Sequence, residues 1–380
     1  MSFTKEDTAR AKGVGILLLM FHHLFYNPNF IENHGMEFWL IPKNVIQPIA
    51  VGARVCVWIF VFLSVYGLTI QYEAARGRET TLQFYVKRWL SLLKAFWPAY
   101  IVVFIGYWIV RGNPMSVYEN NPIRLGLDAF GIADLFQSPM LTGVWWYMCL
   151  AQVIVFIVPL LSHMTKRWGF GSFFLTFVLL QFLQDGIHSK YGGSYLNYLL
   201  VAVLAAACVH GALMTRAMKE RSKTSVRIIE AFAMLVTAVL LLMIKVKTSE
   251  FDAWGIGGFV TGIAAFLIIV LVAKYFNVKC VDRVLRFLGK HSGNMFMIHA
   301  FLYGPCSRLI FWSHSALLSY ITLAALSLLL SIGIELVKKL IRYDSLFSRL
   351  TNRLVLALFS QKVTIVDKLE PRLPARPARC

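Results

Sequence analysis

Charged residues are scarce in this sequence. They make up 15% of its 380 residues, whereas soluble globular proteins carry roughly 25%. Hydrophobic residues make up 58%, and the mean hydropathy is +0.64. The length alone would suggest two or three soluble domains, but so much apolar surface cannot be hidden in soluble cores. The composition therefore indicates a single all-α membrane domain.

Acidic residues are especially few, with 19 Asp and Glu against 38 Lys and Arg. A net charge of +19 first suggests a nucleic-acid partner. However, the basic residues recur in short clusters between apolar runs, as cytoplasmic loops of membrane proteins do. The charge pattern thus excludes nucleic acid as the expected partner and favours membrane lipid.

Cysteine pairs and glycosylation sequons are absent. The six cysteines are scattered without a CxxC pair, so neither a disulfide framework nor a zinc site is expected, and no other metal site is predicted. No Asn-x-Ser/Thr sequon occurs. A signal-peptide cleavage site is also missing after the first apolar run, which is therefore expected to be a retained membrane span.

Apolar runs long enough to cross a membrane dominate the chain, since a span needs about 20 mostly apolar residues. We expect ten transmembrane helices, with polar residues interrupting the first, fifth and ninth. The expected spans lie near 13–33, 50–72, 91–110, 144–163, 169–187, 196–214, 228–247, 254–274, 293–312 and 316–337.

The distribution of Lys and Arg predicts the topology. If both termini are cytoplasmic, 30 of the 38 basic residues fall on the cytoplasmic side. Residues 1–340 are then the membrane domain, and 341–380 form a basic cytoplasmic tail. In that tail, leucines recur every four residues over 346–358, which predicts a helix at the membrane surface, as does the basic, aromatic stretch 85–100. The Pro- and Arg-rich end, 370–380, is expected to be disordered.

Two adjacent histidines follow the first apolar run, in "KGVGILLLMFHH". His23 lies eleven residues after Lys12, about 16 Å along a helix and close to three full turns, so the two share a helix face. An ionisable group near mid-membrane usually marks a functional site facing the protein interior. A hydrogen-bonded structural histidine is the alternative, and it is favoured for His22, which points about 100° away.

A second intramembrane histidine lies in "LGKHSGNMFMIHAF" (288–301). Ser292 and His299 are seven residues apart, nearly two turns, and so face the same way. Two spans with such histidines favour one shared polar cavity over two unrelated packing histidines. Arg54 and the tryptophans of "GVWWYMCLAQ" are weaker signals, because snorkelling is an alternative for Arg54 and an aromatic belt is the favoured account of the tryptophans taken alone.

Five segments, taken in order, resemble those of acyltransferase family 3, membrane proteins that O-acylate carbohydrates and other acceptors. The first is the basic residue, ten residues and histidine of Lys12 to His23, where Lys replaces the usual Arg. The others are "WIFVFLSVYGLTI", where Val65 replaces a usual Gly, "YVKRWLSLLKAFWPAY", "VWWYMCLAQVIVFIVPLL" and "LGKHSGNMFMIHAF". The esterase-like extension that some members carry is not expected here.

The resemblance implies transfer of an acyl group, most often acetyl from acetyl-CoA, to a sugar hydroxyl, in the cell membrane of a bacterium. No permanently bound cofactor is expected. His23 is predicted to be the general base, and Lys12 and His299 are predicted to be further catalytic residues. Ser292, His22, Arg54 and Trp146 are predicted to contact the substrates, and Arg88, Lys94 and Lys290 to hold the phosphates of the donor. The acceptor would be a glycan or a lipid-linked sugar.

Two other functions fit ten spans with intramembrane histidines. One is a proton-coupled transporter, although no internal repeat and no matched pair of broken spans is seen. The other is a glycan flippase or scaffold without chemistry. The acceptor, the acyl length and the oligomeric state are not determined by the sequence.

Overall fold

The computed structural model describes residues 3–182, 188–189, 193–219, 223–247, 256–276 and 278–369. The predicted all-α class is confirmed, since the described strands are only the two-residue β1 (His188–Ser189) and β2 (Gly193–Ser194). The long helices are α1 (Lys5–Phe25), α4 (Val55–Ala75), α5 (Thr81–Arg111), α7 (Trp146–Trp168), α11 (Thr224–Lys247), α12 (Ile256–Tyr275), α13 (Lys279–Tyr303), α15 (Ala316–Leu340) and α16 (Tyr343–Leu369).

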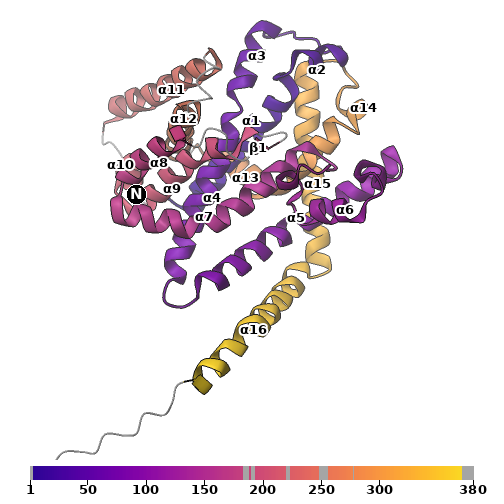
Figure 1. Cartoon of the computed structure of the whole chain (residues 1–380). Coiled ribbons are helices and arrows are strands. Elements are labelled where there is room, and N and C mark those ends of the chain that lie inside the picture. The colour runs from indigo at the N-terminus through magenta and orange to yellow at the C-terminus, as the bar shows by residue number, and fades with distance from the viewer. Residues whose placement is uncertain are drawn as a thin grey trace, which may run out of the picture.

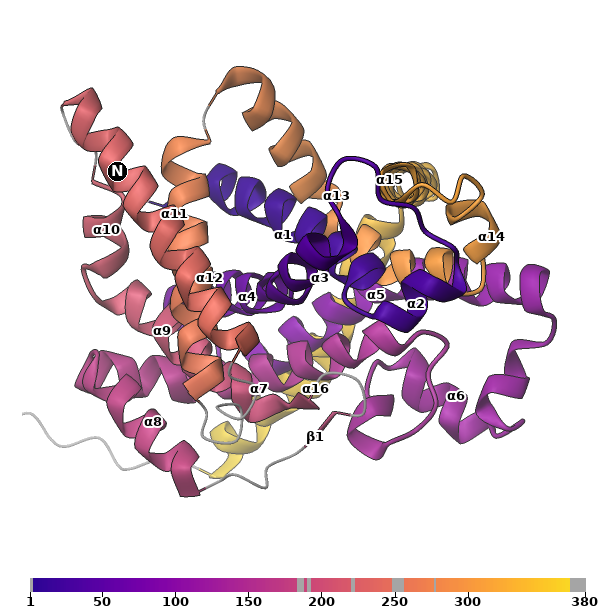
Figure 2. The same cartoon turned by 90° about the horizontal axis from the view of Figure 1, so that it is seen from above.

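Shorter helices connect or flank these. They are α2 (Pro28–Asn33), α3 (Lys43–Gly52), η1 (Pro114–Tyr118), α6 (Pro122–Ala129), η2 (Ala133–Phe136), η3 (Gly143–Trp145), α8 (Gly171–Phe182), η4 (Tyr195–Tyr198), α9 (Leu199–His210), α10 (Leu213–Ala217) and α14 (Ser307–Ile310). Figure 2 shows α1 and α4 near the middle of the helical body, with α11 and α12 on one side and α14 on the other.

Six helical stretches in the described part of the chain are long and apolar enough to cross a membrane. They are 43–75, which joins α3 and α4, and helices α5, α7, α11, α12 and α15. Helices α8 and α9 are apolar but shorter. A multi-pass membrane protein is thus confirmed, while ten spans and the cytoplasmic placement of both ends remain predictions.

Several predicted span boundaries differ from the observed helices. The first helix runs over 5–25 rather than 13–33, and the ninth over 279–303 rather than 293–312. Both helices begin with turns of charged residues, which a hydropathy criterion does not include in a membrane span. The stretch 85–100 and the third span, 91–110, belong to one continuous helix, α5. The fifth predicted span, 169–187, extends into residues outside the described part.

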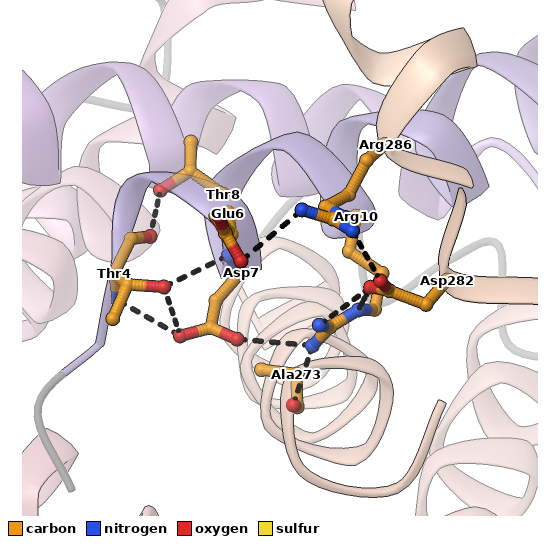
Figure 3. Close-up of polar contacts among 8 residues, drawn as sticks. All are labelled: Thr4, Glu6, Asp7, Thr8, Arg10, Ala273, Asp282 and Arg286. Carbon is orange, nitrogen blue, oxygen red and sulfur yellow. Dashed lines mark hydrogen bonds and ion pairs between the residues drawn. The ribbon is translucent and has the colours of Figure 1, made fainter. Parts of the chain in front are cut away.

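Helix α1 begins with a reciprocal cap. The Thr4 hydroxyl accepts a hydrogen bond from the backbone N–H of Asp7, and the Asp7 carboxylate accepts one from the backbone N–H of Thr4. This capping box supplies partners to donors that a helix start leaves unpaired. Asp7 also forms an ion pair with Arg10 at 2.9 Å, which links the cap to the next turn of the helix (Figure 3).

The buried Arg10 joins three helices at this end of the bundle. Its guanidinium donates to Asp282 of α13 at 2.8 Å and to the backbone carbonyl of Ala273 in α12 at 2.7 Å (Figure 3). Arg286 adds ion pairs to Asp282 and Glu6. Removing one partner of a buried ion pair costs about 3–5 kcal/mol, so this network fixes where α13 starts relative to α1.

Among the described helices, α1 and α13 form the most extensive pair, and they approach each other through glycine. A Cβ on Gly13 would fall well inside van der Waals contact with the backbone of Leu285, and one on Gly289 would do the same with the backbone of Ala9. Small residues let membrane helices approach this closely. The two helices that carry the predicted histidines are therefore in backbone contact along their first turns.

The connection between α5 and α7 is organised around the buried Asp128. One carboxylate oxygen accepts from the Tyr118 hydroxyl at 2.7 Å and from the backbone N–H of Leu141 at 3.1 Å. The other, Oδ1, has no hydrogen-bond partner among the described residues. Burial raises the pKa of Asp128 to about 7, against two hydrogen bonds that lower it.

This buried carboxyl makes stability depend on pH. Because its folded pKa is raised, its contribution is fully present below the unfolded value near 3.8 and is lost as the pH rises through about 7. We expect the melting temperature of the purified protein to fall between pH 5 and pH 8 and Asp128→Asn to lessen that fall. An equal fall in both proteins would show that Asp128 is ionised throughout.

Helix α16 leaves the body and extends away from it (Figure 1). Its first turns are attached to α5, because Lys94 pairs with Asp344 at 2.8 Å and Phe347 packs on Trp97. The predicted row Leu346, Leu350, Leu354 and Leu358 is exposed. Such an uncovered apolar row is consistent with the predicted helix at the membrane surface. The predicted disordered end, 370–380, lies outside the described residues.

Candidate functional site

His23 and His299 meet between α1 and α13. Their ring centroids lie 5.1 Å apart, although the residues are far apart in the sequence. The Tyr303 ring stacks on His23 with centroids 5.7 Å apart, and its hydroxyl lies 3.4 Å from His23 Nδ1. His23 keeps some accessible surface, whereas His299 is fully buried. The two histidines that were predicted to lie within the membrane thus form one cluster.

The hydrogen bonds of the buried histidines define their tautomers. His299 Nδ1 lies 2.7 Å from the carbonyl oxygen of Phe296, and His22 Nδ1 lies 2.8 Å from that of Ala50. A carbonyl oxygen only accepts, so Nδ1 donates in both rings and a neutral ring presents Nε2 as an acceptor. His299 Nε2 is buried and has no partner among the described residues. In the described part of the chain, no protein donor therefore occupies this acceptor atom.

His22 lies beside the cluster rather than apart from it. Its ring is 5.2 Å from that of His23 and stacks on Tyr26 at 4.6 Å. The bond to the Ala50 carbonyl connects α1 to α3. This anchoring matches the structural alternative expected for His22, while its position leaves the predicted substrate contact open.

Arg54 lies at the start of α4, close enough to His22, His23 and Tyr198 for its charge to act on all three. Tyr198 in turn stacks on Trp146, with centroids 5.8 Å apart. Arg54 and Trp146 are thus brought to the same side of the molecule through Tyr198. Arg54 is exposed and hydrogen-bonds Tyr198, and its predicted contact with the substrate remains a prediction.

The aromatic wall continues from Trp146 towards His299. Tyr147 packs on Phe296 with centroids 4.9 Å apart, and Phe296 lies 5.9 Å from His299. Phe60 of α4 closes the group at 5.9 Å from Phe296. The histidines therefore lie against apolar and aromatic surface, and such surroundings favour their neutral form.

Lys12 and Ser292 are placed differently from the histidines. Lys12 lies three turns before His23 on α1 and is partly buried, next to the glycine that contacts α13. The Ser292 hydroxyl is buried and donates to the backbone carbonyl of Gly289 at 2.8 Å. Its proton is thus engaged within its own helix, which leaves only its lone pairs for a ligand.

The three predicted phosphate-binding residues do not form one cluster. Arg88 hydrogen-bonds Gln71 of α4. Lys94 pairs with Asp344, which lines a pocket together with Lys290. Lys290 precedes His299 by nine residues, or two and a half turns, so it lies on the opposite face of α13. Their predicted role with the donor remains a prediction.

Two residues, one on α13 near His299 and one at the start of α1, were not expected from the sequence. Tyr303 follows His299 by four residues, so helical periodicity could have placed it on the same face. Arg10 could not have been distinguished from Lys12, because its partner Asp282 is 272 residues away. No cluster of metal-ligating side chains occurs within the described ranges, and the five described cysteines are unpaired thiols.

Comparison with known proteins identifies the family. No curated protein and no solved structure matches the chain. The family model described as an acyltransferase domain matches residues 10–336. That range contains all five segments of the expected resemblance and both His23 and His299. The chain therefore belongs to acyltransferase family 3, as a multi-pass membrane acyltransferase.

Proposed function

We propose that the protein transfers an acyl group, acetyl in the simplest case, from acyl-CoA to a hydroxyl of a cell-surface or exported carbohydrate. The supporting observation is the contact between His23 and His299 within a chain of this family. A hydroxyl is a poor nucleophile and needs a base within hydrogen-bond reach. A neutral imidazole provides that base.

The proposed reaction assigns one role to each histidine. His23, which keeps accessible surface, removes the proton from the acceptor hydroxyl as its oxygen attacks the thioester carbonyl. The carbon–sulfur bond then breaks, and the thiolate of the donor leaves with a proton returned by His23. His299 is fixed by its bond to Phe296 and packs against His23. It orients the donor or the acceptor through Nε2, which has no hydrogen-bond partner among the described residues. Tyr303 positions the His23 ring.

In the experiment, radiolabelled acetyl-CoA is incubated with the purified protein and, in a parallel sample, with sealed vesicles that contain the protein. Release of free CoA with label on an acceptor supports the enzyme. Uptake of label into vesicles without loss of the thioester would instead indicate a transporter. Mass spectrometry of surface glycans from cells with and without the chain then identifies the acceptor.

Lys12 provides a separate test of charge at the basic end of α1. We propose that the ammonium of Lys12, which precedes His23 by three turns of α1, binds a phosphate of the donor. Lys12→Arg keeps the charge and should preserve most activity, whereas Lys12→Met should raise the KM for acetyl-CoA at least about tenfold, as expected for loss of a charge-assisted hydrogen bond. An active Met variant with unchanged KM would limit Lys12 to membrane topology.

A further inference from the structure

A basic pocket lies where α13, α15 and the start of α16 meet. Its volume is about 530 Å³. His291 lies in its wall and is held by Ser331 of α15 at 2.9 Å. The lining residues are Lys290, His291, Ile332, Glu335, Leu336, Lys338, Lys339, Arg342, Asp344 and Ser345.

The carboxylates of this pocket are already neutralised. Glu335 pairs with Lys338 at 2.8 Å, and Asp344 pairs with Lys94 at 2.8 Å. The remaining cations are Lys290, Lys339 and Arg342. Within the described part of the chain these three make no ion pair and no side-chain hydrogen bond. The pocket therefore presents three unneutralised positive charges and is complementary to an anion.

The surroundings of the pocket indicate where the rest of the ligand lies. The pocket is at the end of the membrane-spanning α15, whose last turn carries Lys338 and Lys339. On the same turns Leu336, Val337 and Leu340 are 62%, 56% and 83% exposed. Cations at the end of a span, next to bare apolar side chains, match a headgroup with hydrocarbon chains attached.

The pocket is separate from the histidine cluster. Lys290 lies on the opposite face of α13 from His299, and Gly289, its neighbour, faces α1. An acyl-CoA whose phosphates were bound in this pocket would have to pass around α13 for its thioester to reach His23. This placement favours a ligand that stays at the lipid-facing side over the acyl donor.

We propose that the pocket binds the phosphate of an anionic phospholipid, with the lipid chains lying along the end of α15. Lys290, Lys339 and Arg342 contact the phosphate, and the Lys94–Asp344 pair holds α16 against the site. A bound lipid then links α13, α15 and α16. The inference concerns lipid binding alone and holds whether or not acyl transfer is observed.

The test is native mass spectrometry of the full chain in detergent with phosphatidylglycerol or, in a separate sample, phosphatidylcholine of equal chain length. The wild type should retain phosphatidylglycerol preferentially. The triple variant Lys290→Gln/Lys339→Gln/Arg342→Gln should lose at least about tenfold in affinity for phosphatidylglycerol, because each cation near a lipid surface contributes appreciably. Its weak binding of phosphatidylcholine should not change.

The matched control is Arg283→Gln, an exposed arginine of α13 that does not line the pocket; it should bind phosphatidylglycerol as the wild type does. If gel filtration shows that the triple variant aggregates, Lys339→Gln alone, at an exposed position, should still weaken binding severalfold. Equal binding by wild type and variants overturns the proposal. Displacement of phosphatidylglycerol by coenzyme A alone would also overturn it and assign the pocket to the donor.

Discussion

Replacing His23 by Gln should abolish acyl transfer while leaving the protein folded. Gln approximates the size of the ring but cannot accept a proton, and a positioned general base contributes about 10²–10⁴-fold to a rate. The contacts of His23 are ring packing with His22, Tyr26, His299 and Tyr303, together with one long hydrogen bond at 3.4 Å. The loss should therefore appear in kcat far more than in thermal stability. The measurement is label transferred from acetyl-CoA per mole of purified protein.

The matched control for this experiment is His163→Gln, since His163 is an exposed histidine at the far end of α7. Its activity should equal that of the wild type. An active His23→Gln protein would remove His23 from the mechanism. If His299→Gln alone were inactive at the same time, the base would be His299 Nε2 instead. Loss of both activity and helical content in His23→Gln would indicate a structural role.

Much of the histidine site follows from helical periodicity. The spacing in the first and ninth helices places His23 and His299 on defined faces, and each lies deep in an apolar run. The sequence does not show which helix faces pack against each other. Helices α1 and α13 are joined by contacts between residues more than 270 positions apart, such as Arg10 and Asp282. The two histidines that were expected to share a polar cavity lie in direct ring contact, and the cavity itself remains a prediction.

The errors in span boundaries have a physical origin. Hydropathy assigns Asp282 and Arg286 to a loop, since isolated charges are costly in a membrane. In the folded chain these charges are paired with each other and with Arg10 and Glu6. Helix α13 can therefore start at Lys279 and continue uninterrupted to Tyr303. Tertiary pairing, which a single sequence does not display, sets the helix start.

Gly289→Ala should be strongly damaging, since among the described glycines an added Cβ at this position makes the closest contact. A methyl group there would collide with the backbone of Ala9, and backbone atoms cannot turn aside as a flexible side chain can. Helices α1 and α13 would have to separate, breaking their extensive contact. Overpacking typically costs about 1–3 kcal/mol, and the same displacement moves His299 relative to His23. Both the melting temperature and acyl transfer should fall.

Gly293 provides the matched control, one turn further along the same helix. A Cβ at Gly293 meets nothing within 4 Å, so Gly293→Ala should gain up to about 1 kcal/mol from helix propensity. The two variants carry the same chemical change on one helix, and opposite shifts in melting temperature are expected. Equal stability of both would mean that α1 and α13 are not in backbone contact. A stable but inactive Gly289→Ala protein would show that activity depends on the distance between the helices, because the histidines themselves are unchanged.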